Sequence, residues 1–196
     1  MLHFDYKNMS NIYSLGDEVI NAENEEKDLG FIVSDTLKPS SQCTAAAKSA
    51  NKTLGMINRT LVNRESKIIL KLYQSLVIPK LEYCAQAWRP YLKKDTDVLK
   101  KVQKRATRFM IKDRSLSYEE RLQRLGLTSL ETRRLRDLIE VFKTFKGFDN
   151  IKYTQFFTMS DTGLRGQKLK NYKPQAHLDI RKYFFSIRVI EEWNVE

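Results

Sequence analysis

The sequence predicts a mainly α-helical protein with a short β segment at its N-terminus. The chain of 196 residues has only seven glycines and four prolines, whereas 30% of its residues are charged, a balance that favours helices. Apolar residues recur at helical spacing after residue 36, and short alternating pieces precede it. We expect three regions: a β segment at 1–36, a helical region at 37–112, and a C-terminal helical region with a basic irregular segment at 113–196.

The N-terminal β segment contains turn signals and one clear strand candidate. Gly16 and Asp17 separate short apolar pieces, which predicts a tight turn. The piece DLGFIV predicts a strand from Leu29 to Val33. Pro39 and the two serines after it mark the joint to the helical region.

The first helix is predicted within SQCTAAAKSANKTLGMINRTL, residues 41–61. Its apolar side chains fall within about 40° of one line, and they are Cys43, Ala47, Ala50, Leu54, Ile57 and Leu61. Lys48, Lys52 and Arg59 fall on the opposite side. The next apolar stretch, residues 68–76, predicts a second helix that stops near Pro79.

A third helix, with Asp95 as its N-cap, is predicted to have separate apolar and cationic faces. In this helix the apolar side chains between Val98 and Met110 occupy about 120° of arc. The cations occupy the opposite arc, and they are Lys100, Lys101, Lys104, Arg105 and Arg108. Solvated helix faces usually interleave Glu with Lys, but no acid interrupts this arc. The pattern therefore favours contact with a polyanion over a solvated surface.

Two capping boxes predict helices in the C-terminal region. Ser117–Glu120 opens a short helix that ends at Gly126, and Thr128–Glu131 opens a longer one that ends near Gly147. Cations near the start of the longer helix oppose its macrodipole, which makes them candidates for contact with an external anion. These cations are Arg133, Arg134 and Arg136.

The remainder of the chain predicts a basic irregular segment followed by one amphipathic helix. Residues 148–177 have no clear period. In the stretch LDIRKYFFSIRVIEEW we expect the apolar side to dock through Phe184, Ile187 and Ile190. The cations that we expect to stay in solvent are Arg181, Lys182 and Arg188.

The net charge of +11 is unevenly distributed along the chain. Residues 1–35 hold two lysines against eight acids, a net of −6, whereas residues 36–196 have a net of +17. Such a basic block predicts a polyanionic partner, either nucleic acid or an anionic membrane surface. We favour nucleic acid over a membrane, because the chain has no lipidation motif and the apolar arcs are needed for the core.

Motifs for catalysis and metal binding are missing from the sequence. It contains no Asp-Asp pair, P-loop, GxGxxG or HExxH. Cys43 and Cys84 have no CxxC neighbour, and the two histidines belong to no ligand cluster. We therefore predict no catalytic residue, no metal ligand and no cofactor.

The first residues do not resemble a signal peptide, and no uncharged apolar run approaches about 18 residues. We expect a soluble, intracellular protein of the nucleus or cytoplasm.

Several stretches resemble the region downstream of the catalytic palm in reverse transcriptases of LINE-type non-LTR retrotransposons. They are EEKDLGFIVSDTLKPSSQC, AAAKSANKTLGMINR, LYQSLVIPKLEYCAQAWRPYLKKDTDVLKKVQKRATRFM and LQRLGLTSLETRRLRDLIEVFKTFKG. The closing YKPQAHLDIRKYFFSIRVIEEWN is similar to the C-terminal end of those open reading frames. The resemblance covers nearly the whole chain, and the segment 72–110 is its most specific part.

The resemblance implies that residues 1–36 are the end of the palm, with a primer-grip-like pair at Leu29 and Gly30. It implies that residues 37–112 form a helical thumb that follows an RNA–DNA hybrid. It also implies that the aspartates that bind Mg²⁺ in the full family enzyme are missing here, so this fragment is not an enzyme on its own. The implied partners are RNA, DNA or their hybrid, and a palm-containing polypeptide. Two alternatives stay open: a non-enzymatic interaction module for nucleic acid or protein, and a decayed element copy without function.

Overall fold

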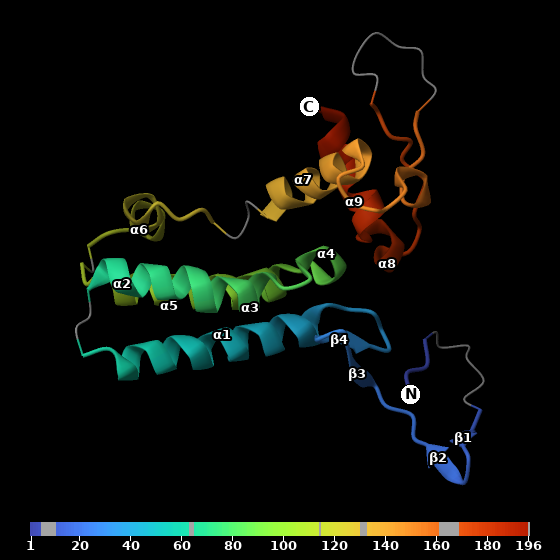
Figure 1. The fold of residues 1–196 in the computed structure, drawn as a ribbon, viewed down its shortest axis with the longest axis horizontal. Coiled ribbons are helices and arrows are strands. Elements are labelled where there is room, and N and C mark those ends of the chain that lie inside the picture. The colour runs from blue at the N-terminus through green and yellow to red at the C-terminus, as the bar shows by residue number, and fades with distance from the viewer. Residues whose placement is uncertain (5–10, 63–64, 114, 130–132, 161–168, 196) are drawn as a thin grey trace. The chain divides into compact units, whose positions relative to one another are not determined.

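A computed structural model describes residues 1–4, 11–62, 65–113, 115–129, 133–160 and 169–195 (Figure 1). The chain divides into two compact units, Met1–Leu127 and Thr128–Glu196. The predicted fold class is confirmed: the protein is mainly α-helical, with short antiparallel hairpins at the N-terminus. Residues 112 and 113, where we expected a boundary between regions, both belong to the first unit.

The first hairpin pairs β1, Tyr13–Leu15, with β2, Glu18–Ile20. Gly16 has a φ of 64° and lies in the turn between them, as the sequence predicts. All six strand residues are exposed, and none of them belongs to the buried core of the described residues.

The second hairpin pairs β3, Glu25–Asp28, with β4, Phe31–Ser34. The prediction that a strand begins at Leu29 is wrong. Leu29, with a φ of 45°, and Gly30, with a φ of 88°, are the two residues between the strands. Two successive positive φ values are the requirement of a type I′ hairpin turn, so these residues reverse the chain instead of extending it.

Helix α1, Ser40–Thr60, is the first predicted helix, and the residues of its apolar stripe from Cys43 to Ile57 are buried. It packs against α3 and α5. Gln42 is also buried, and its Oε1 accepts a 2.9 Å hydrogen bond from the backbone N–H of Ile32. This bond fastens the second hairpin to the start of the helix.

The second predicted helix does not stop at Pro79. Helix α2, Ser66–Leu72, continues as the π-helical turn η1, Tyr73–Val77, and then as α3, Ile78–Glu82. In η1 the N–H of Ile78 reaches back five residues, to the Tyr73 carbonyl. Pro79 thereby falls in the first turn of α3, where its missing N–H is not needed. A short helix, α4, Ala85–Trp88, follows.

Helix α5, Lys93–Met110, begins two residues before the predicted cap. Asp95 is therefore not the N-cap, a position held by Leu92, but a buried residue of the first turn. Its Oδ2 accepts a 2.7 Å hydrogen bond from the Ser40 hydroxyl. The helix dipole favours a carboxylate in this turn, and the bond joins the start of α5 to the start of α1.

Helix α6, Tyr118–Leu125, begins and ends where the sequence predicts. Ser117 and Glu120 form a complete capping box, and Gly126 ends the helix with a φ of 62°. The helix packs on α5, where Tyr118 donates a 2.7 Å hydrogen bond to Gln103 Oε1. This contact explains why burial on α5 extends past the apolar arc to Gln103 and Thr107.

The second unit contains α7, Arg133–Lys146, the 3₁₀ turn η3, Tyr153–Gln155, α8, Asp179–Lys182, and α9, Phe185–Val195. Its core brings together Val141, Phe157, Val189 and Ile190. Helix α7 ends before Gly147, which has a φ of 70°. The predicted box at Thr128–Glu131 extends outside the described residues.

The predicted C-terminal helix is divided into α8 and α9 by Tyr183 and Phe184. Ile187 and Ile190 are buried as predicted, but Phe184 is 55% exposed and Phe185 packs against the core instead. Arg188 does not stay in solvent. Its Nε lies 3.2 Å from Oδ2 of Asp137 on α7, and only 10% of its side chain is exposed.

Candidate nucleic-acid interface

Helices α1 and α5 run parallel, side by side, in the first unit. The Ser40–Asp95 bond joins their first turns, and farther along Arg105 Nη1 donates a 3.3 Å hydrogen bond to Asn51 Oδ1. Both contacts link residues that are 54 or 55 positions apart in sequence, which fixes the alignment of the two helices. Cations of α1 and α5 are therefore neighbours in space although they are distant in sequence.

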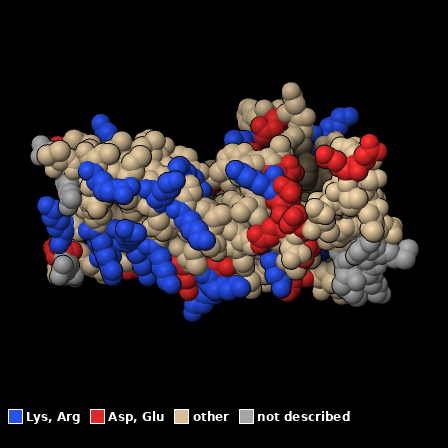
Figure 2. Space-filling model, turned by 90° about the horizontal axis from the view of Figure 1, so that it is seen from below, with Lys and Arg blue, Asp and Glu red and all other residues tan. Residues whose placement is uncertain are grey.

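Seven predicted cations on these two helices are exposed, and we call them the basic face. They are Lys48, Lys52 and Arg59 on α1, and Lys101, Lys104, Arg105 and Arg108 on α5. Figure 2, which views the molecule from the side of α1, shows Lys and Arg side chains gathered over this helical part. The structure thus unites two groups of cations that the sequence identifies separately.

The basic face lacks compensating acids. Helix α1 contains no Asp or Glu, and α5 contains none between Val98 and Met110. Within the described part of the chain, none of the seven cations forms an ion pair. Each keeps its charge available to an external anion.

One cation of α5, Lys104, is directed toward α6. Lys104 Nζ lies 5.2 Å from the centre of the Tyr118 ring, a cation–π contact that leaves the ammonium group exposed. Lys100, which the sequence places among the candidates, is half-buried. Because its side chain is not fully exposed, it is not counted in the basic face.

The primer-grip-like pair lies elsewhere in the first unit, at the tip of the second hairpin. The Tyr83 hydroxyl donates a 2.7 Å hydrogen bond to the Leu29 carbonyl, while the Leu29 side chain is 78% exposed. A Cβ atom on Gly30 would lie 3.1 Å from Cε1 of Tyr83. The pKa of Tyr83 is raised, first by a hydrogen bond with Cys84, so its hydroxyl keeps its proton.

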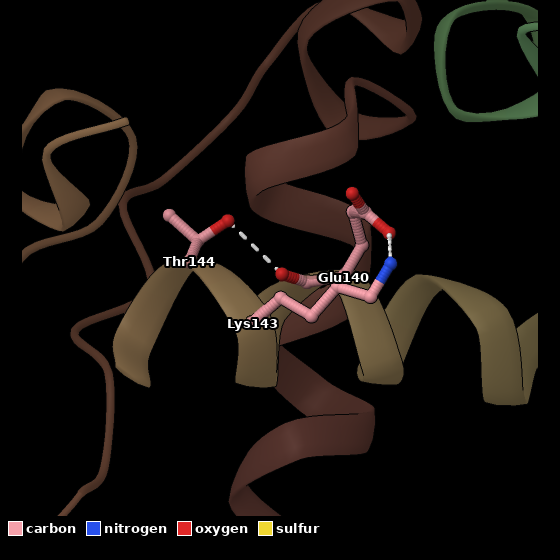
Figure 3. A network of polar contacts seen from close by, with 3 residues as sticks. All are labelled: Glu140, Lys143 and Thr144. Atoms are coloured by element: carbon pink, nitrogen blue, oxygen red, sulfur yellow. Dashed lines mark hydrogen bonds and ion pairs between the residues drawn. The ribbon is translucent and has the colours of Figure 1, made fainter. Parts of the chain in front are cut away.

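Helix α7 of the second unit contains the other three candidate cations. Arg133, Arg134 and Arg136 lie on α7, but their side chains are outside the described part of the structure. Farther along α7, Lys143 Nζ lies 3.4 Å from Glu140 Oε2, and Thr144 donates to the Glu140 carbonyl (Figure 3). The described cations of this helix are thus partly neutralised, in contrast to the basic face.

Sequence reasoning missed one charged residue beside the basic face. Arg121 of α6 is only 5% exposed, and its Nε donates a 3.4 Å hydrogen bond to Thr107 Oγ1. A signal was present, because Arg121 follows Tyr118 by three residues and precedes Leu125 by four, spacings that place all three on one side of α6.

Other features of the structure bear on the predicted chemistry. Within the described ranges, no three His, Cys, Asp or Glu side chains form a group that could hold a metal ion. Cys43 and Cys84 are both free thiols. No helix in the described ranges combines the length and apolar character needed to cross a membrane. Comparisons of the chain with protein-family models, curated proteins and solved structures give no match.

Proposed function

We propose that this chain binds the phosphate backbone of a template–primer through the basic face. In this proposal it is the thumb and post-thumb fragment of a non-LTR retrotransposon reverse transcriptase, without catalytic aspartates and therefore without polymerase activity of its own. The observation that carries the proposal is the parallel packing of α1 and α5, which aligns two rows of unpaired cations. The assignment to a reverse transcriptase is supported by the sequence resemblance.

The chemistry of the basic face favours backbone contact over base reading. Its members are Lys and Arg side chains on two adjacent helices that are both packed into the unit, so neither helix is free to enter a groove. Phosphate contacts position a nucleic acid without reading its sequence. Roughly six such contacts give a log–log salt slope of about −4 to −5.

The test is binding of the full chain to an RNA–DNA hybrid across a salt series. The variant Lys52→Gln, Lys101→Gln, Arg105→Gln removes three charges from the basic face. Its matched control, Lys67→Gln, Lys71→Gln, Arg124→Gln, removes three exposed charges from α2 and α6. We expect the first variant to reduce the slope by about 2 to 3 and the control to leave it unchanged. Equal slopes in all three proteins would overturn the proposal.

The N-terminal hairpins support a palm-containing polypeptide as the protein partner. Leu15 of β1 and Val19 of β2 are 77% and 61% exposed, although apolar strand residues are normally covered. Mixing the chain with a catalytic palm fragment tests this partner directly. We expect primer extension that neither piece gives alone, and no extension by the mixture would reject the pairing.

A further inference from the structure

A hollow of about 870 Å³ lies beside the basic face, between α5, the linker that follows it and the start of α6. Four cations line it: Lys104 and Arg108 from α5, Lys112 from the linker and Arg121 from α6. Among the described lining residues, Asp113 is the sole acid. Four cations against one carboxylate leave the hollow with a net positive charge.

The carboxylate of Asp113 is already engaged. Its Oδ1 accepts hydrogen bonds from the Ser115 backbone N–H, at 2.9 Å, and from the Ser115 hydroxyl, at 2.6 Å. These bonds lower the pKa of Asp113, and the nearby charge of Arg124 lowers it further. Arg124 lines a second hollow, which Lys112 and Asp113 also line. Asp113 and Lys112 both line the two hollows, so the charge balance of the first depends on its other cations. Lys104, Arg108 and Arg121 leave it with a net positive charge.

Arg121 is a buried cation in the lining of the hollow, and hydrogen bonds hold its guanidinium group in place. Its Nε donates to Thr107 Oγ1 and its Nη1 donates to the Leu116 carbonyl, and neither acceptor carries a charge. These two bonds orient the guanidinium group and do not involve its Nη2 amino group. Burying a cation without a counter-charge is unfavourable. An anion in the hollow would supply the missing charge.

We propose that this hollow is a binding site for a phosphate monoester. A monoester dianion carries about −1.5 to −2 charges and three acceptor oxygens, which suits several converging cations better than the single charge of a backbone phosphodiester. The volume also accommodates the nucleoside attached to such a phosphate. The monoester has two possible sources: a free phosphate compound, or the phosphorylated end of a strand on the basic face. The second source rests on the proposed function.

The first experiment uses inorganic phosphate and does not depend on nucleic-acid binding. Phosphate is titrated into the full chain at constant ionic strength, and NMR follows the Nε–H signal of Arg121. We expect a saturable shift that chloride does not produce. Lys112→Gln changes an exposed lining residue and is expected to weaken phosphate binding roughly tenfold. The matched control Lys71→Gln, on α2 and outside the lining, leaves the affinity unchanged.

The second experiment identifies the source of the phosphate. One RNA–DNA hybrid is prepared with 5′-phosphate, 3′-phosphate or hydroxyl ends only, and its affinity is measured for the wild-type chain and Lys112→Gln. A strand-end site predicts roughly tenfold tighter binding of one phosphorylated hybrid, and Lys112→Gln abolishes this preference. Equal binding of all three hybrids, together with a phosphate-dependent Arg121 shift, identifies a free phosphate compound as the ligand.

The two proposals can fail separately. If no hybrid binds but phosphate still shifts Arg121, the proposed function is wrong and the phosphate site stands. If the hybrids bind without preference and phosphate causes no shift at Arg121, the phosphate site is overturned and the basic face is not affected.

Discussion

Tyr83 holds the turn of the second hairpin, since its hydroxyl donates a 2.7 Å hydrogen bond to the carbonyl of Leu29. The ring also lies against Gly30, where a Cβ atom would approach Cε1 to 3.1 Å. Leu29 has a φ of 45°, a conformation that costs a non-glycine residue about 1 kcal/mol or more. The loop after α3 thus stabilises an unfavourable backbone conformation at the tip of the hairpin.

Gly30→Ala is expected to destabilise the first unit by about 1 to 2 kcal/mol. The φ of 88° is unfavourable for alanine, and the new methyl group would press against the Tyr83 ring. Chemical denaturation measures the change. Gly55→Ala is the control, because Gly55 lies within α1 with nothing within 4 Å of a Cβ, so alanine there stabilises by about 0.5 to 1 kcal/mol. The same sign at both positions would contradict this account of the turn.

The capping box of α6 makes this helix sensitive to acid. Hydrogen bonds from Ser117 lower the pKa of Glu120 below its ordinary value of 4.5. Because the folded pKa lies below the unfolded one, the stabilisation is fully present above about pH 4.5 and is lost as pH falls through the folded value. Glu120→Gln should lower the melting temperature at pH 7 and make no difference well below the folded pKa. A constant difference between wild type and variant at both pH values would show that the carboxylate is not the cause.

The sequence contains enough local information to predict the helices with strong end signals. The complete capping box at Ser117, the chain reversal at Gly126 and the apolar stripe of α1 all depend on residues close together in sequence. The errors arise where distant contacts decide the outcome. Pro79 continues a helix because a π-helical turn precedes it, and Asp95 is drawn into the first turn of α5 by Ser40, 55 residues away.

In the candidate site, too, local sequence predicts some features and distant contacts decide the others. Helical spacing alone identifies the cations of α1 and of α5 as exposed, but it cannot align one helix with the other. Their alignment depends on tertiary contacts such as Asn51–Arg105. Arg121 was missed because burial of an arginine depends on α5 and the linker supplying acceptors for it.

In the second unit, Asp137 and Arg188 form a buried ion pair between α7 and α9. Asp137→Asn removes the carboxylate charge that faces the buried Arg188 side chain, so we expect a loss of about 3 kcal/mol in the free energy of unfolding. Replacing both residues, as in Asp137→Leu, Arg188→Met, is expected to recover most of that loss. Lys173→Gln breaks the exposed pair with Glu191 and should cost less than about 1 kcal/mol. A cost for Asp137→Asn no larger than that of Lys173→Gln would show that the buried pair contributes little.

The first hairpin is expected to cause self-association of the isolated chain. Both of its strands are exposed, and among the described residues they pair only with each other. Leu15 and Val19 are apolar and exposed on them. Unpaired strand edges with apolar side chains pair readily with other chains. Val19→Lys places a charge on the edge and should shift the chain toward the monomer in analytical ultracentrifugation, whereas Val62→Lys, at a fully exposed position after α1, should not. A wild-type chain that stays monomeric at high concentration would show that the hairpin edge does not pair with other chains. Equal effects of both substitutions would attribute the association to net charge rather than to the edge.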